Sequence, residues 1–199
     1  MKKIFVLAVT AAAMTLASCG TQKQASSSAL RSSIGDALPE EPCIALAEEA
    51  PAIRKYGNGQ HFKESTARNL AENQARASFA RSIAAAVKTA TEEIGVSLDK
   101  YAGDDTDGRS VSDQSGEGND FVMSIASEIV KNTHPIKTTR YLKSNNQYNI
   151  YVCLEYMGTE NQMAEQIEDS LKDKISPEDR AKLEKRHNDF RQRALNALR

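Results

Sequence analysis

A single stretch, from Glu64 to Ile94, contains neither glycine nor proline and limits the folds open to this chain. It is rich in Ala, Arg and Glu, which favour helix. Gly95 follows it, where a helix C-cap is expected. The alanines of its first half leave a narrow surface, so a sheet or a second helix can approach closely. The predicted apolar stripe consists of Phe79, Ile83, Val87, Ala90 and Ile94, and the small residues are Ala67, Ala71, Ala75 and Ala77.

The segments around this helix predict short strands and one further helix. Residues 52–60 are expected to form a short strand that closes in a turn at Gly57-Asn58-Gly59. A helix is expected from Phe121 to about Asn132, stopped by Pro135. Residues 136–143 and 147–157 are then expected to form an antiparallel hairpin around Ser144-Asn145-Asn146, because the second segment alternates apolar and polar residues.

Two more helices are expected at the C-terminus. The first starts at Thr159 or Glu160 and continues to Ile175, and the second starts at Ser176-Pro177 and continues to the end of the chain. His187 falls in the apolar stripe of the last helix and is expected to be half-buried. The order of elements predicts an α+β fold, with the long alanine-rich helix packed on one face of a small antiparallel sheet, plus the C-terminal helices.

The N-terminal residues have the features of an export signal. Lys2 and Lys3 precede an apolar stretch from Ile4 to Leu16, which is too short for a membrane span of about 20 residues and is typical of a secretory signal. Leu16-Ala17-Ser18-Cys19 resembles the lipobox of bacterial lipoproteins, which implies cleavage before Cys19 and acylation of that residue. Gly20 in place of Asp resembles the pattern sorted to the outer membrane. The absence of an acidic cluster after Cys19 favours the periplasmic face. The alternative is an ordinary signal peptide with a chance cysteine.

The whole chain of 199 residues is long enough for one domain, with 40% hydrophobic and 27% charged residues. Its formal net charge of -1 excludes a strongly basic nucleic-acid binder. We expect four parts: a signal peptide at 1–18, a lipidated Cys with a flexible tether at 19–51, an α+β domain at 52–175, and a basic amphipathic helix at 176–199. One helical turn is expected within the tether, at 43–50.

The centre of the chain resembles a known family. Tyr56-Gly57-Asn58-Gly59, the alanines that follow, Ala75-Arg76 and the late strand at 148–155 are similar to the LPP-twenty family of small outer-membrane lipoproteins. The resemblance covers residues 52–157. It implies an envelope lipoprotein with an accessory or structural role, and it carries no catalytic residue to transfer. The acidic loop before Phe121 and the last helix depart from the family pattern.

Motifs for catalysis or metal binding are weak. The three histidines have no ligand spacing with each other or with cysteine, and no HExxH, CxxC or GxSxG occurs. We therefore expect no catalytic residue, no metal and no cofactor. Asp104 to Gly108 approaches an EF-hand loop, but Gly103 and Gln114 occupy its first and last ligand positions. A looser calcium site and a solvated acidic loop remain as alternatives.

Cysteine parity indicates a disulfide. If Cys19 is acylated, Cys43 and Cys153 are the two thiols left in an oxidising compartment. The prediction is a Cys43–Cys153 bridge that ties the N-terminal connector to the hairpin. The alternative is two separate buried thiols.

An interaction surface is expected on the hairpin and the last helix. Tyr151 lies on one hairpin face with Asn149 and Glu155, and the last helix presents Arg186, Arg191 and Arg193. The alternative is a last helix that only closes the domain, through Leu183, Phe190 and Leu198.

These patterns predict a lipid-anchored, periplasm-facing accessory or structural lipoprotein of the outer membrane that acts as a protein-interaction module without catalysis. Its expected partners are the membrane, through the N-terminal lipid, and an envelope protein, but not nucleic acid. One alternative is a periplasmic enzyme or small-ligand binder that uses the hairpin face and the acidic loop. Another is a homo-oligomer that assembles into rings or layers.

Overall fold

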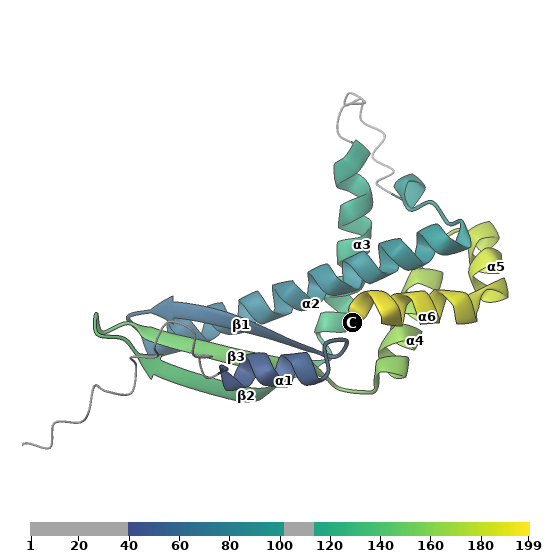
Figure 1. The fold of residues 1–199 in the computed structure, drawn as a ribbon. Helices are drawn as coiled ribbons and strands as arrows, with labels where there is room; N and C mark the ends of the chain where they lie inside the picture. The colour runs from purple at the N-terminus through teal and green to yellow at the C-terminus, as the bar shows by residue number, and fades with distance from the viewer. Residues whose placement is uncertain (1–39, 102–113) are drawn as a thin grey trace, which may run out of the picture. The chain divides into compact units, whose positions relative to one another are not determined.

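A three-stranded antiparallel sheet with the strand order β1-β3-β2 organises the protein in the computed structural model (Figure 1). The structure describes residues 40–101 and 114–199, which belong to one unit that begins at Glu40. The strands are β1 (Arg54–His61), β2 (Thr133–Leu142) and β3 (Tyr148–Tyr156). The helices are α1 (Pro42–Glu49), α2 (Glu64–Ile94), the 3-10 turn η2 (Asp99–Tyr101), α3 (Gln114–Val130), α4 (Glu160–Lys172), α5 (Pro177–Lys185) and α6 (His187–Leu198). The predicted α+β class is confirmed.

The alternation along β3 decides which helix covers which face of the sheet. Ile150, Val152 and Leu154 are buried in the main core together with residues of α2. Cys153 points to the opposite face and packs against α1, in a small cluster with Cys43 and Ala47. The sheet therefore lies between the long helix α2 and the short helix α1 (Figure 1).

Two glycines let α2 approach β1 closely. A Cβ atom at Gly57 would lie 2.1 Å from the carbonyl oxygen of Ala71, and one at Gly59 would lie 2.0 Å from that of Ala67. The turn expected at Gly57-Asn58-Gly59 is wrong, because β1 continues through all three residues to His61. Glycine occurs here because a second backbone lies against the strand, which is one of its regular roles inside sheets.

The second half of α2 leaves the sheet and packs against helices. Phe79 and Ile83 are fully buried with Phe190 of α6 and Ile125 of α3 in the same core. Large residues replace the alanines of the first half, because helix axes pack about 8–10 Å apart and need side chains to fill the space. Gly95 ends α2 in the left-handed conformation, with φ 74°, as expected.

Some boundaries differ from the sequence expectation. Helix α3 begins at Gln114 rather than at Phe121. β2 begins at Thr133 and includes Pro135, which an edge strand tolerates next to the bulge between Pro135 and Lys137. The predicted last helix is two helices, because Arg186 leaves helical geometry with φ -122° and ψ 26°. His187 is exposed rather than half-buried.

The break at Arg186 changes the direction of the chain so that α6 can lie along α2. Phe190, Ala194 and Leu198 are buried on this side of α6. Among the described helices, none combines the length and the apolar character needed to cross a bilayer.

Candidate functional site

The three hairpin residues predicted as a contact surface are engaged within the protein. The Asn58 side chain donates to Asn149 Oδ1 at 2.6 Å, and Arg54 donates to Glu155 at 2.6 Å, across the β1–β3 pair. The Tyr151 ring packs edge-on against Tyr141, with centroids 6.2 Å apart. These contacts lie on the face of the sheet that α1 covers.

The three predicted arginines of the last helix also have partners within the chain. Arg186 donates to the backbone carbonyl of Glu93 at 2.7 Å and pairs with Asp189 at 3.1 Å. Arg193 pairs with the Glu93 carboxylate at 3.3 Å. Since Glu93 lies near the end of α2, these two arginines stabilise the packing of α6 on α2.

Arg191 fastens α6 to α4 through a buried carboxylate. Its guanidinium pairs with Glu168, whose side chain is 1% exposed, and the other oxygen of that carboxylate lies 2.5 Å from Lys172 Nζ. The hydrogen bond to Glu168 raises the pKa of Arg191. Two cations compensate the desolvation of one buried anion, which is the condition for such a group to be tolerated.

The structure does not bring the two predicted halves of the interaction surface together. The hairpin residues face α1, whereas α6 packs on α2, which covers the other face of the sheet. The alternative interpretation of the last helix therefore has direct support: Leu183, Phe190 and Leu198 are buried and help to close the core.

Cys43 and Cys153 lie in the same buried cluster, as two free thiols. The predicted disulfide is not formed in the structure, and both thiols are buried and unbonded, as in the alternative, although they share one cluster. Cys43 Sγ lies 3.7 Å from both the Lys137 carbonyl and Thr139 Oγ1 of β2. Burial raises the pKa of both thiols, that of Cys153 to about 12. Both are therefore protonated at neutral pH and unsuited to nucleophilic catalysis.

A second polar cluster was missed by the sequence reasoning. The Tyr101 hydroxyl donates to Asp179 at 2.5 Å and accepts from the Ser176 backbone N–H at 2.9 Å. Lys100 and Lys182 pair with the same carboxylate, which is fully buried. Burial alone would raise the pKa of Asp179, but the hydrogen bonds from Lys100, Tyr101 and Lys182 lower it to about 2. The cluster ties η2 to the first turn of α5. In the sequence, the N-cap pattern Ser176-Pro177 indicated only the start of α5, and no pattern indicated the contact with Tyr101 of η2.

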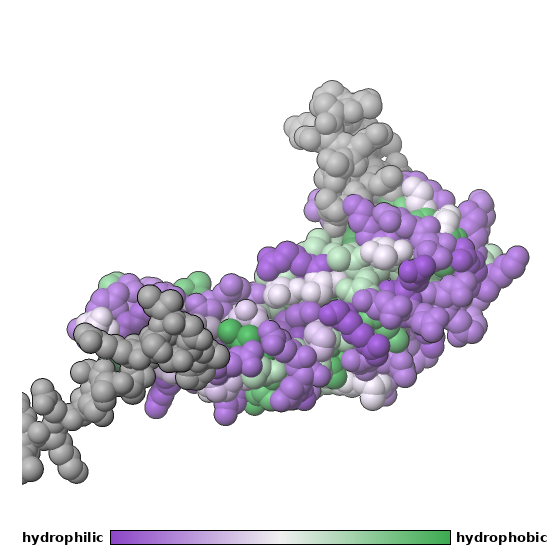
Figure 2. Space-filling view, in the orientation of Figure 1, coloured by the Kyte–Doolittle hydropathy of each residue, from purple (hydrophilic) through white to green (hydrophobic). Residues whose placement is uncertain are grey.

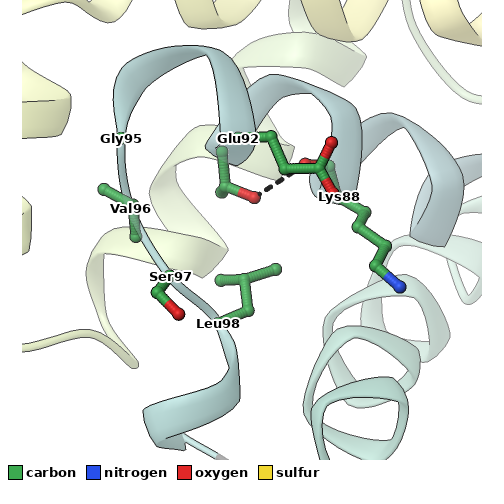
Figure 3. Close-up of a pocket in the computed structure, with 7 residues that line it drawn as sticks. Lys88, Glu92, Gly95, Val96, Ser97 and Leu98 are labelled. Carbon is green, nitrogen blue, oxygen red and sulfur yellow. Dashed lines mark hydrogen bonds between the residues drawn. The ribbon is translucent and has the colours of Figure 1, made fainter. Parts of the chain in front are cut away.

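Two hollows among the described residues are open grooves along α2. One, of about 530 Å³, is formed by the end of α2 and the segment after it, as Figure 3 shows. Its one buried polar side chain, Thr91, is already bonded to backbone carbonyls of its own helix at 2.9 Å. A second groove, of about 390 Å³, lies between α2 and α3 and has an apolar floor with Arg81 and Lys88 at its rim. In neither groove do described polar groups converge on one point, as a catalytic site requires.

Metal binding gains no support from the described ranges 40–101 and 114–199, where no three His, Cys, Asp or Glu side chains gather. The acidic segment Asp104–Gly108, proposed as a loose calcium site, lies outside them. The surface drawn in Figure 2 is mostly hydrophilic, with paler and hydrophobic residues in the middle, where α2 passes.

Comparison with known proteins adds no family assignment. A scan against protein-family models finds no match, and a search of curated proteins finds no significant match. The resemblance to the LPP-twenty lipoproteins therefore stays a prediction.

Proposed function

We propose that this protein is a lipid-anchored accessory lipoprotein of the outer membrane, facing the periplasm, whose folded domain acts by contact and not by catalysis. The observation that carries the proposal is the sequence Leu16-Ala17-Ser18-Cys19, which follows a charged start and a short apolar stretch. Acyl chains on one N-terminal cysteine anchor a protein stably when more than one is attached.

The start of the folded unit supports this arrangement. The unit begins at Glu40, so residues 20–39 separate it from the proposed anchor. A chain of that length reaches at most about 70 Å when fully extended. Anchoring of this kind holds a domain near the membrane at high effective concentration, so that weak contacts suffice for function.

The pairing of polar side chains in the domain supports a role in protein contact rather than in catalysis. Glu168, Asp179 and the Arg54–Glu155 pair are each occupied in joining two elements of the fold. Groups paired in this way stabilise the packing of one element of the fold against another.

Metabolic labelling with an alkyne fatty acid in the native host, followed by membrane fractionation, tests the anchor. The wild-type chain is expected to take up label and to sediment with membranes. Cys19→Ser should lose the label and lose processing before residue 19. Cys43→Ser is the matched control and should keep both. Label or membrane partition unchanged in Cys19→Ser would overturn the proposal.

A further inference from the structure

Four of the six exposed large hydrophobic side chains among the described residues lie near one end of the sheet. Phe62 and Leu142 are 62% and 63% exposed, and Leu70 and Tyr141 lie nearby at 45% and 47%. Phe62 directly follows the last residue of β1, and Leu142 is the last residue of β2. His61, Tyr148 and Leu142 occupy one rung of the sheet. Adjacent strands lie about 4.8 Å apart, so the two strand ends are separated by about 10 Å.

Phe62 and Leu142, the two most exposed of these residues, are each followed by a lysine. We define the sheet tip as Phe62, Lys63, Leu142 and Lys143. Residues 60–63 and 140–148 contain three basic residues and no acidic one, in a chain whose formal net charge is -1. The third basic residue, Arg140, pairs with Glu64 at 3.1 Å. The sheet tip is thus an apolar surface with a positive rim.

Helix α1, the first element of the folded unit, begins on the side of the sheet that carries the sheet tip. The Glu41 carboxylate, at the start of α1, accepts a hydrogen bond from Thr139, three residues before Leu142 on β2. The other end of α1 lies near Arg54, where β1 begins. In Figure 1 the first turn of α1 accordingly lies toward the end of the sheet at which β1 finishes.

We infer that the sheet tip docks onto a lipid surface that contains anionic phospholipid, with Phe62 and Leu142 in the headgroup region. This inference rests on the proposed anchor, which places a membrane within reach of the tip. Apolar side chains enter the interface while neighbouring lysines extend toward phosphate groups. Anionic lipids attract basic residues near the surface, and the attraction fades within a Debye length. Docking orients the domain, with β1 and β2 ending at the membrane.

A tryptophan probe tests the docking directly, because the chain contains no tryptophan. Phe62→Trp places the probe at the sheet tip. Met157→Trp is the matched control, since Met157 is 60% exposed and follows β3 at the other end of the sheet. The lipidated full chain carrying either change is reconstituted into phosphatidylethanolamine–phosphatidylglycerol vesicles with brominated acyl chains, and emission and quenching are recorded.

Docking predicts a blue-shifted emission for Phe62→Trp and at least about twofold more quenching than for Met157→Trp, because indole favours the membrane interface. Lys63→Glu with Lys143→Glu should reduce that quenching, whereas Lys131→Glu with Lys185→Glu, two exposed lysines elsewhere, should not. If both probes are quenched equally in protein that co-floats with the vesicles, the inference of docking is overturned, whereas the proposal of the lipid anchor is not. A blue shift that requires envelope proteins in the vesicles would also overturn it, in favour of a protein partner.

The unlipidated chain separates the two proposals. Phe62→Trp combined with Cys19→Ser is mixed with the same vesicles at high lipid concentration. Quenching that exceeds that of the Met157→Trp control in the same background supports docking even if labelling shows that Cys19 is not acylated.

Discussion

Replacing Gly59 with alanine tests the close packing of α2 on β1. The new Cβ atom would lie 2.0 Å from the Ala67 carbonyl oxygen and 2.6 Å from the Ala71 backbone nitrogen, whereas Cβ atoms essentially never approach a heavy atom below 3.0 Å. Both obstacles are backbone atoms of α2, so no side chain can rotate away. The helix has to move outward by about 1 Å, a gap that forfeits a quarter to a half of the contact energy along the interface.

The expected loss in the free energy of unfolding follows from this displacement of the helix. Overpacking a well-filled interior costs about 1–3 kcal/mol, and the backbone obstacles place Gly59→Ala at the upper end, near 3 kcal/mol. The change also lowers the entropy of the unfolded chain, which offsets about 0.4–1 kcal/mol. A net loss of about 2 kcal/mol lowers the melting temperature of a domain of this size by about 4–8 °C.

Urea unfolding of the unlipidated chain, followed by circular dichroism, measures this loss. Gly95→Ala is the matched control, because nothing lies within 4 Å of its Cβ position and only the φ of 74° is unfavourable. That strain costs about 1 kcal/mol. If Gly59→Ala unfolds at the same urea concentration as the wild type, or costs no more than Gly95→Ala, the packing argument is wrong.

Three further outcomes follow from the buried clusters. Mild oxidation should join Cys43 to Cys153, detected as a cross-linked peptide by mass spectrometry without reduction; its absence under conditions that oxidise a model dithiol counts against the shared cluster. Because folding lowers the pKa of Asp179 from 3.8 to about 2, its stabilisation of about 2 kcal/mol is present above pH 4 and is lost as the pH falls toward 2. Asp179→Asn should therefore lower stability at pH 7 and flatten the pH dependence of urea unfolding between pH 4 and 2; an unchanged slope would contradict the assignment. Arg191→Ala should cost about 2 kcal/mol by removing a charged hydrogen bond from a buried glutamate, whereas the exposed pair of Arg193 should contribute less than about 1 kcal/mol; equal costs in thermal unfolding would argue against a buried tie.

The elements that the sequence predicted correctly are those specified by nearby residues. The long helix ends at Gly95 because a left-handed C-cap is a local property of glycine. Thr159 caps α4 through a reciprocal hydrogen-bond pair with Gln162, three residues away. The alternation of apolar and polar residues along β3 predicted which side chains lie on each face of the strand, although not what covers each face.

The errors occur where a distant segment decides the outcome. Gly57-Asn58-Gly59 has the composition of a turn, and only the presence of α2 against it shows why a strand needs glycine there. The arginines of the last helix fit an interface by composition, yet their partners, Glu93 and Glu168, lie on α2 and α4. A charge pattern along one helix carries no information about the carboxylates that folding brings beside it.

By itself, the sequence determined the α+β class, the long helix, the hairpin and the expectation of a lipidated Cys19, since each depends on residue types within a few positions of one another. Only the tertiary structure brought Cys43 beside Cys153, Tyr101 onto Asp179, and the two apolar–lysine pairs to one end of the sheet. The physical reason is that these contacts depend on strand register and helix packing, which are set by burial of the whole core and not by local conformational preference.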